Sequence, residues 1–210
     1  MYNIAMPLSP LPVEFYQQPV VDAARALLGM RLVRCLNEKR LSGLIYETEA
    51  YEGESDLACH VRAGRTPRTE TMYGPPGKAY IYFIYGMHWM LNAVTGPVGF
   101  PAAVLIRAML VDEGLEEIAR RREGSPQRDW ASGPAKLCKA LGIDGKLNGI
   151  DMADPSGELW IAQGQFVPER AVITGPRVGI DRVPEPWRSK PWRFRIDLQR
   201  WSPPQGTNGV

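Results

Sequence analysis

The sequence contains few of the residues that build disulfide frameworks or metal sites. Its 210 residues include 3 cysteines and 2 histidines. The cysteines are odd in number, widely spaced and in no Cys-x-x-Cys pair, which favours reduced thiols. Cys59 and His60 are neighbours, and adjacent side chains on an extended chain rarely chelate one ion. We therefore expect no metal ion and no other cofactor.

Long hydrophobic runs and an excess of one charge are also missing. No apolar stretch reaches the ~20 residues of a membrane span, and the first ten residues lack the basic and apolar regions of a signal peptide. The 25 Lys and Arg residues nearly balance the 23 Asp and Glu residues, so net charge alone does not indicate a nucleic-acid partner. We expect a protein that is neither membrane-bound nor secreted: cytoplasmic or nucleoid-associated, or nuclear if eukaryotic.

Glycine and proline, by contrast, are abundant. There are 21 glycines and 19 prolines, without a Gly-X-Y period or a low-complexity tract, which predicts many turns and irregular loops. The length and the 44% hydrophobic content suit one compact domain. We expect this domain to span residues 1–210, with irregular ends at 1–10 and 202–210.

Apolar patterning predicts helices and strands in alternation. Helical spacing followed by glycine indicates helices over 19–29, 112–122 and 134–141. Short runs rich in β-branched and aromatic residues predict strands at 30–36, 42–51, 78–95 in two parts, 102–110, 158–164, 171–180 and 192–197. This order predicts an α+β fold, with a curved, mainly antiparallel β-sheet flanked by helices and a protruding β-hairpin that turns at 85–87.

One strand carries an unusual number of acidic residues. Residues 47–56 hold five Asp or Glu side chains and no Lys or Arg. A strand period of two places Glu47, Glu49 and Tyr51 on one face. That face is either solvated surface or the place of a general base, because a carboxylate partly shielded from water can accept a proton from an attacking water molecule. Arg107 interrupts another apolar strand and needs a counter-charge if buried, which the acidic strand can supply.

Basic residues are concentrated on either side of the acidic strand. Between residues 60 and 80, one acidic residue faces Arg62, Arg65, Arg68 and Lys78. Residues 177–200 carry seven Lys or Arg against three acidic residues, and tryptophans interleave with them. Such segments suit a polyanion, although ordinary solvated loops give the same pattern. The helix start at Ser132 to Lys136 is either a phosphate contact or a capped helix with a solvated lysine.

The hairpin places a large aromatic residue at its turn. Tyr80 and Tyr82 share one face of the first strand, and Tyr85 stands at the turn. A ring at a hairpin tip either packs against the molecule or protrudes as a wedge that can enter a base stack.

Five segments in this order resemble the alkyladenine (3-methyladenine) DNA glycosylase family: YETEAYEGESDLACH, GRTPR, MYGPPGKAYIYFIYGMHWMLN, AVLIRA and GPAKLCKAL. The resemblance runs from about residue 11 to residue 201. It implies a single α+β domain on a curved antiparallel sheet, and an activity that excises alkylated and deaminated purines from duplex DNA.

The resemblance also implies roles for individual residues. Glu49 matches the general base that activates the hydrolytic water, and Arg107 matches the arginine that helps to hold it. Tyr51 and His60 match residues that stack on or hydrogen-bond the extruded base. A water nucleophile implies a monofunctional enzyme that leaves an abasic site without cutting the strand. Neutral purines need an acid to leave, and His60 is one candidate donor.

Further matches concern selectivity and DNA binding. Tyr82 matches the ring on the opposite face of the base, Asn92 matches a residue that disfavours guanine through its exocyclic amine, and Tyr85 matches the wedge. The chain departs from the family pattern at residues 88–89, which leaves the breadth of substrates open. The candidates for contacts with the DNA backbone are Arg65, Arg68, Lys78 and Lys136.

Two other functions remain as alternatives. A non-catalytic protein that binds damaged DNA would keep the wedge and the basic segments but not the Glu49 and Arg107 pair. A hydrolase of free N-glycosides would need neither wedge nor basic segments, and its activity would show little salt dependence. We expect a monomer whose partner is duplex DNA.

Overall fold

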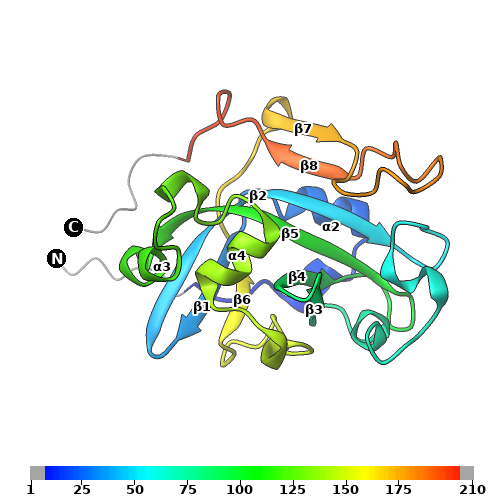
Figure 1. Cartoon of the computed structure of the whole chain (residues 1–210), viewed down its shortest axis with the longest axis horizontal. Coiled ribbons are helices and arrows are strands. Elements are labelled where there is room, and N and C mark those ends of the chain that lie inside the picture. Colours follow the sequence, from blue (N-terminus) through cyan, green and yellow to red (C-terminus); the bar gives the residue numbers. More distant parts are fainter. Residues whose placement is uncertain (1–7, 204–210) are drawn as a thin grey trace.

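A mainly antiparallel β-sheet of eight strands organises the chain, of which the computed structural model describes residues 8–203 (Figure 1). Six strands follow in the order β3-β4-β5-β2-β1-β6, while β8 pairs with β2 and β7. The strands are β1 (Arg31–Leu36), β2 (Lys39–Glu52), β3 (Ala79–Ile84), β4 (His88–Val94), β5 (Ala102–Glu113), β6 (Leu159–Ala162), β7 (Val172–Gly175) and β8 (Arg193–Ile196). The long strands β2 and β5 bend across the molecule. The predicted α+β fold with a curved antiparallel sheet is confirmed.

Short helices complete this single domain. The α-helices are α1 (Val13–Tyr16), α2 (Val20–Ala26), α3 (Leu115–Arg121) and α4 (Pro134–Leu141). The 3-10 helices are η1 (His60–Ala63), η2 (Glu70–Tyr73), η3 (Gln127–Asp129), η4 (Gly145–Leu147) and η5 (Glu169–Ala171). Within residues 8–203, none of these helices is long and apolar enough to cross a membrane.

Proline and glycine mark the ends of the helices that pack on the sheet. Pro19 precedes α2, and Pro134 is the first residue of α4, where its missing N–H costs no hydrogen bond. Gly142 ends α4 in the left-handed conformation, with φ of 62°. The helices predicted at 19–29 and 134–141 are therefore present, the first of them shorter than predicted.

The helix predicted at 112–122 begins later than expected. Asp112 and Glu113 belong to β5, where their carboxylates pair across the sheet with Arg31 at 2.6 Å and Arg40 at 2.6 Å. Gly114 then turns the chain with φ of 73°, and a Cβ there would meet the Leu41 side chain at 2.3 Å. The acidic pair resembles the first turn of a helix, but its cross-strand partners hold it in the sheet.

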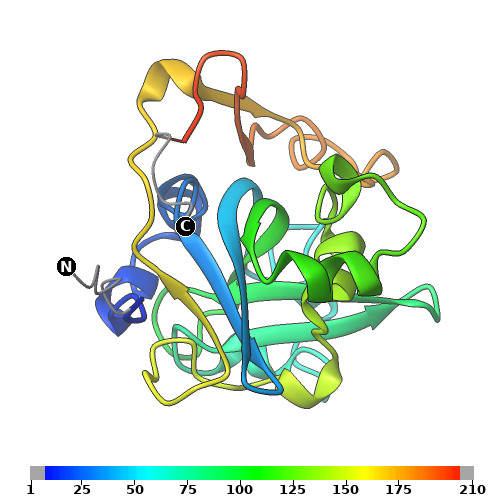
Figure 2. The same ribbon diagram turned by 90° about the vertical axis from the view of Figure 1, so that its left-hand side faces the viewer.

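Two tight turns set the hairpins. Asn37 and Glu38 both have positive φ between β1 and β2, and Tyr85 and Gly86 have φ of 56° and 67° between β3 and β4. Two consecutive residues at positive φ match the twist of the flanking strands. The β3–β4 hairpin projects from the body of the molecule, as predicted (Figure 2).

Two of the three buried clusters among the described residues position the site. The main core joins α2, α4 and the central strands through residues such as Leu27, Leu137 and Ile106. A second cluster fastens the long 53–77 segment, with η1 and η2, onto β3, β4 and β5. The aromatic rings of Tyr51 and Tyr82 pack against this second cluster. The second cluster therefore forms the base of the site described next.

The described ends of the chain are irregular but attached. The Leu8 carbonyl accepts a hydrogen bond from the Trp160 indole at 2.7 Å, and Pro10 bridges to Ala162 of β6. The Trp201 indole donates to the Phe166 carbonyl at 3.1 Å. Of the ends predicted to be irregular, residues 1–7 and 204–210 lie outside the described residues.

Candidate active site

A cavity of about 210 Å³ opens between the β3–β4 hairpin, β5, the 58–60 segment and the 178–180 segment. Aromatic and polar side chains from the hairpin, β5, the 58–60 segment and β2 line it, and the 178–180 segment adds nonpolar residues. The lining residues include Tyr51, His60, Tyr80, Tyr82, Tyr85, Asn92, Arg107 and Val178. The resemblance had proposed six of these eight residues for the site, and the fold brings them together from sequence positions up to 56 apart, the separation of Tyr51 and Arg107.

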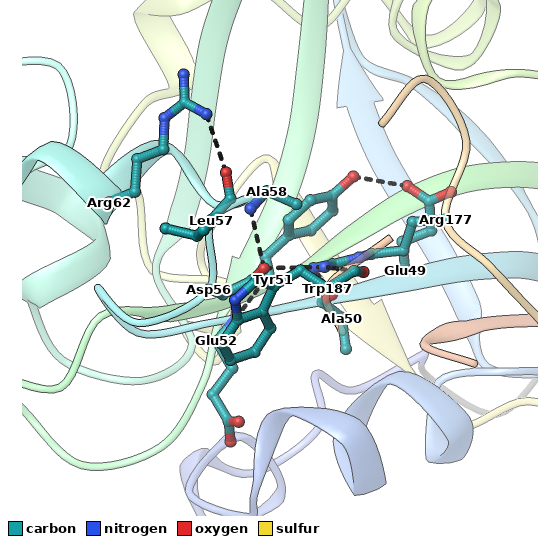
Figure 3. Close-up of polar contacts among 10 residues, drawn as sticks. All are labelled: Glu49, Ala50, Tyr51, Glu52, Asp56, Leu57, Ala58, Arg62, Arg177 and Trp187. Carbon is teal, nitrogen blue, oxygen red and sulfur yellow. Dashed lines mark hydrogen bonds and ion pairs between the residues drawn. The ribbon is translucent and has the colours of Figure 1, made fainter. Parts of the chain in front are cut away.

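Glu49 lies directly behind the wall of this cavity. Its side chain is 0% exposed, which excludes the interpretation of the acidic strand as solvated surface at this position. Its Oε1 accepts a hydrogen bond from the Val178 backbone N–H at 2.7 Å. Its Oε2 accepts one from the Tyr51 hydroxyl at 2.9 Å, as Figure 3 shows. Both of these donors to the Glu49 carboxylate therefore belong to residues that line the cavity.

Arg107 supplies the cation that this buried acid requires. Its Nη1 lies 3.3 Å from Glu49 Oε2, and its Nε donates to Glu47 Oε1 at 2.9 Å. Arg193 of β8 approaches the same Glu47 oxygen at 3.7 Å. The predicted counter-charge for Arg107 is thus confirmed as the acidic strand. One bulge in β2 at Tyr46 and one in β5 at Arg107 interrupt the pairing of these strands, and Glu47, Glu49 and Tyr51 face the same side.

Burial and the neighbouring charges act in opposite directions on these groups. Burial raises the pKa of Glu49 above its ordinary value, while Arg107, the Val178 N–H and the Tyr51 hydroxyl limit that rise. Burial likewise raises the pKa of Tyr51, and the Glu49 charge adds to it. Glu49 is therefore a more basic carboxylate than a solvated one, beside a tyrosine that keeps its proton.

The opposite wall is aromatic. The His60 ring meets the Tyr82 ring edge-on at 4.4 Å between centroids, and its Nδ1 lies 3.1 Å from the Tyr80 hydroxyl. Burial, followed by the charges of Arg68 and Arg62, lowers the pKa of His60 to about 4. His60 is therefore neutral near pH 7 and a poor source of a proton for a leaving base.

Two further lining residues contribute an amide and a thiol to the cavity. Asn92 is buried on β4, where its Nδ2 donates to the Tyr80 carbonyl at 3.0 Å. Cys59 also lines the cavity, and burial raises the pKa of its thiol to about 12. The thiol is therefore protonated near neutral pH and is not an activated nucleophile.

Tyr85 stands at the outer rim. Its side chain is 80% exposed although one part of it lines the cavity, so the ring is not a packing staple. Its backbone is left-handed, a conformation that costs a tyrosine ~1 kcal/mol or more. The turn thus holds an exposed ring at some cost to the fold.

The proposed DNA-backbone residues have different surroundings. Arg65 pairs with Glu70 at 2.7 Å, and Lys78 approaches Asp151 at 3.3 Å. Arg68 is exposed and lies over the Tyr82 ring at 5.3 Å, so it stands beside the cavity wall. Arg65 and Lys78 would have to exchange a carboxylate partner for a phosphate.

Lys136 lines a second cavity beside the turn of the hairpin, where Met87, His88 and Trp89 contribute to the wall. Its Nζ donates to the Ser132 hydroxyl at 3.1 Å. The same cavity is lined by the basic side chains of His88, Arg122 and Lys139, and by no acidic residue. Trp89 packs on Phe83 and also faces this cavity, so the departure from the family pattern at residues 88–89 lies outside the first cavity.

Sequence reasoning missed three contributors to the site. Tyr80 shares the face of Tyr82, and this alternation could have placed it in the wall. Arg177, counted with the basic tail at 177–200, is buried and paired with Asp56. Val178 contributes a backbone N–H, which leaves no signal in a sequence. In the described part of the chain, no group of three or more His, Cys, Asp or Glu side chains could hold a metal ion.

Comparisons with known proteins agree on one family. Residues 14–200 match the family described as Methylpurine-DNA glycosylase (MPG). A protein of Methanocella arvoryzae, provisionally named 3-methyladenine DNA glycosylase, is 46% identical over 88% of this chain and 90% of its own length. Relatives with the same provisional name from Carboxydothermus hydrogenoformans and Myxococcus xanthus are each 45% identical, over 91% and 93% of this chain and 97% and 96% of their own. The chain therefore belongs to the methylpurine-DNA glycosylase family and is a DNA glycosylase, a hydrolase that acts on DNA.

Proposed function

We propose that this enzyme flips alkylated or deaminated purines, of the 3-methyladenine, 7-methylguanine and hypoxanthine type, out of duplex DNA. It then hydrolyses the N-glycosidic bond with a water molecule activated by Glu49 and leaves an abasic site for base excision repair. The observation that carries this proposal is the pairing of buried Glu49 with Arg107, which lines an aromatic cavity below an exposed tyrosine.

The surroundings of Glu49 support a role as a general base. A carboxylate has about four acceptor sites. The Val178 N–H, the Tyr51 hydroxyl and Arg107 occupy three of them and leave one for a water molecule. Glu49 takes a proton from that water as its oxygen attacks the sugar carbon, and the glycosidic electron pair leaves with the base. The same negative charge stabilises the oxocarbenium character that develops in the sugar.

The rest of the cavity supports recognition of a flat base. The rings of Tyr51, His60 and Tyr82 offer stacking surfaces, and each stacked base gains ~1 to 3 kcal/mol. His60 is neutral near pH 7, so it does not repel a base that methylation has made cationic. The buried Asn92 amide, next to Tyr80, is the group that we propose disfavours the exocyclic amine of guanine.

The exposed hairpin supports base flipping. Extruding a base costs a few kcal/mol of lost stacking and pairing. The Tyr85 ring extends from the rim of the cavity and can fill the gap that the extruded base leaves. A damaged base that pairs badly is extruded more easily, so part of the selectivity precedes the chemical step.

The leaving base determines whether an acid is needed. Cationic 3-methyladenine and 7-methylguanine leave without protonation, whereas neutral hypoxanthine requires a proton. The lowered pKa of His60 argues against this histidine as the donor near pH 7. A solvent proton or another group on the base side of the cavity then carries that step.

A single-turnover assay tests the proposal. Duplex oligonucleotides that carry hypoxanthine, ethenoadenine or 3-methyladenine are treated with the wild-type enzyme or Glu49→Gln, and strand breaks are measured before and after alkali. We expect breaks only after alkali, with a rate that is ~10² or more lower in Glu49→Gln, and unchanged binding of the damaged duplex. Equal rates for the two proteins would refute the assignment of Glu49.

The same assay separates the alternative functions. Breaks before alkali would indicate strand cleavage in addition to base removal. Preferential binding of damaged duplex without any base release would identify a non-catalytic binding protein. Release of bases from free nucleosides, with little dependence on salt, would identify a hydrolase of free N-glycosides.

A further inference from the structure

We infer that Asp56 and Arg177 form a positioning pair that sets the basicity of Glu49 and the position of the Tyr51 ring. The inference rests on the proposed role of Glu49 as the general base. Neither member of the pair lines the cavity, so both act through neighbouring groups.

The pair is enclosed within the protein. Both side chains are 0% exposed, and Arg177 Nη2 lies 2.9 Å from Asp56 Oδ1 while its Nη1 donates to Oδ2 (Figure 3). Asp56 also accepts a backbone hydrogen bond from Ala58 at 3.0 Å. This carboxylate therefore ties the 56–58 turn, which lies next to the cavity, to a residue 121 positions further along the chain.

Arg177 connects this pair to the base-binding wall. Its guanidinium carbon lies 4.7 Å from the centre of the Tyr51 ring and 5.1 Å from that of Trp192. Its Nη1 also donates to the Ala50 carbonyl at 3.0 Å. The guanidinium thus lies over one face of the Tyr51 ring and fixes the β2 backbone between Glu49 and Tyr51.

The connection to Glu49 is one residue long. The backbone N–H that Glu49 accepts at 2.7 Å belongs to Val178, the next residue after Arg177. The Val178 side chain is 45% exposed, so its own packing does not hold this N–H in place. The position of the donor on Glu49 consequently depends on the anchored guanidinium.

Stability alone is a poor explanation for such a pair. Removing two charges from water costs several kcal/mol per ion, and apolar replacements of buried pairs are often neutral. Among the described residues, Arg177 Nε has no hydrogen-bond partner, which adds to the cost. A geometric role accounts for a charge pair at this place better than a gain in stability does.

Loss of the pair has a specific consequence for pH dependence. Glu49 is surrounded by Arg107 from β5, by Glu47 and Tyr51 from β2, by Tyr82 from β3, and by its cross-strand partner Arg193 from β8. When the Val178 donor moves away, the carboxylate loses a hydrogen bond that favours its charged form. The pKa of Glu49 then rises. The acid limb of the pH–rate profile, where excision increases as Glu49 loses its proton, moves to higher pH.

Two variants of the full-length enzyme test the inference in single-turnover excision across pH. Asp56→Asn/Arg177→Met removes both charges and leaves neither buried alone, while Arg177→Lys keeps the charge but not the planar two-nitrogen contact. We expect the double variant to lose roughly 10- to 100-fold in rate near neutral pH, with its acid limb at higher pH. Arg177→Lys should lie between the double variant and the wild type, with affinity for undamaged duplex unchanged in both.

The control is a second buried arginine with an acidic partner. Arg34 is 5% exposed and pairs with Glu158 on the β1–β6 side of the sheet. Glu158→Gln/Arg34→Met should change the melting temperature without moving the rate or the pH profile. If Asp56→Asn/Arg177→Met does not fold, Arg177→Lys carries the test by itself.

The outcomes separate the two proposals. Positioning variants with a wild-type rate and acid limb, while Glu49→Gln is inactive, would overturn the positioning role alone. Full activity of Glu49→Gln would overturn the proposed function and this inference with it. A loss of rate in the control pair equal to that in the positioning variants would show that both pairs act only through stability, and would also overturn the inference.

Discussion

The rear wall of the cavity and the tip of the hairpin meet at the same site but are built in opposite ways. At the rear, Glu49 has no exposed surface and is held by a backbone donor, a hydroxyl and a guanidinium. At the tip, Tyr85 is 80% exposed, and its position depends on a two-residue turn with positive φ. The charged Glu49 is therefore buried at the rear of the cavity, whereas the aromatic ring of Tyr85 is exposed to solvent at the tip of the hairpin.

The difference follows from what each end must do. A general base is more effective among fixed dipoles in a site with little water, because its charge and orientation are then already established before the reaction. A wedge must reach a partner that lies outside the protein, so it cannot be packed in advance. Changes at the rear should therefore act on the rate and its pH dependence, and changes at the tip on the formation of the flipped complex.

The largest effect is expected from Arg107→Met. Glu47 and Glu49 would lose the cation that lies between them, and the proton taken up to relieve this would neutralise the base. We expect a rate loss of about 10²-fold near neutral pH, with partial recovery as the pH rises. A single-turnover pH series measures it, and Arg193→Gln, which removes the more distant cation from Glu47, is the control. An unchanged excision rate near neutral pH would contradict the conclusion that the rear wall of the cavity, unlike the hairpin tip, determines the rate.

At the tip, Tyr85→Ala should weaken the flipped complex rather than the chemistry. Loss of a stacked ring is worth ~1 to 3 kcal/mol, or roughly 5- to 150-fold in affinity for a damaged duplex. Tyr85→Phe keeps the ring and should bind like the wild type, while the acid limb of the rate should stay in place in both variants. Binding of damaged duplex by Tyr85→Ala with wild-type affinity would refute the wedge.

The wild-type enzyme should show the raised pKa of Glu49 directly. Because burial raises this pKa, the base is protonated at low pH and excision increases with pH through a value above that of an ordinary glutamic acid. A substrate with a cationic base reports the titration of Glu49 alone, because a cationic base leaves without protonation by an acid. Excision of 7-methylguanine that stays constant from pH 4 to pH 8 would contradict a buried base.

Much of this comparison could be predicted from the sequence, because it depends on local patterns. Alternation along a strand placed Glu49 and Tyr51 together, and a charge in an apolar strand required a partner for Arg107. The turn at 85–87 was visible as a break between two aromatic runs. Whether the Tyr85 ring packs or protrudes was not, because exposure depends on how far the hairpin extends beyond the sheet.

Contacts between distant segments explain what could not be predicted. Arg177 belongs to a basic tail in the sequence, yet it pairs with an aspartate 121 residues away and loses all contact with solvent. Asp112 and Glu113 resemble the start of a helix, but arginines on β1 and β2 hold them in β5. In each case the partner lies far away in the sequence, where neither period nor composition gives a signal.

The smallest expected effect concerns the second cavity. It lies beside the exposed hairpin, where we expect contact with the DNA backbone. Lys136 and Lys139 line it, and no acidic side chain in the described part of the chain does so, which leaves each lysine able to neutralise a phosphate beside the hairpin. For Lys136→Gln/Lys139→Gln, we expect the slope of log affinity against log salt to fall by ~0.9 for each lost phosphate contact. The single-turnover rate at saturation should not change, since neither lysine touches the first cavity. Arg170→Gln, an exposed cation in η5 that lines neither cavity, is the matched control. An equal decrease in slope per charge removed for Arg170→Gln would show that general charge accounts for the effect, whereas a decrease confined to the lysine pair would place the DNA backbone beside the turn of the hairpin.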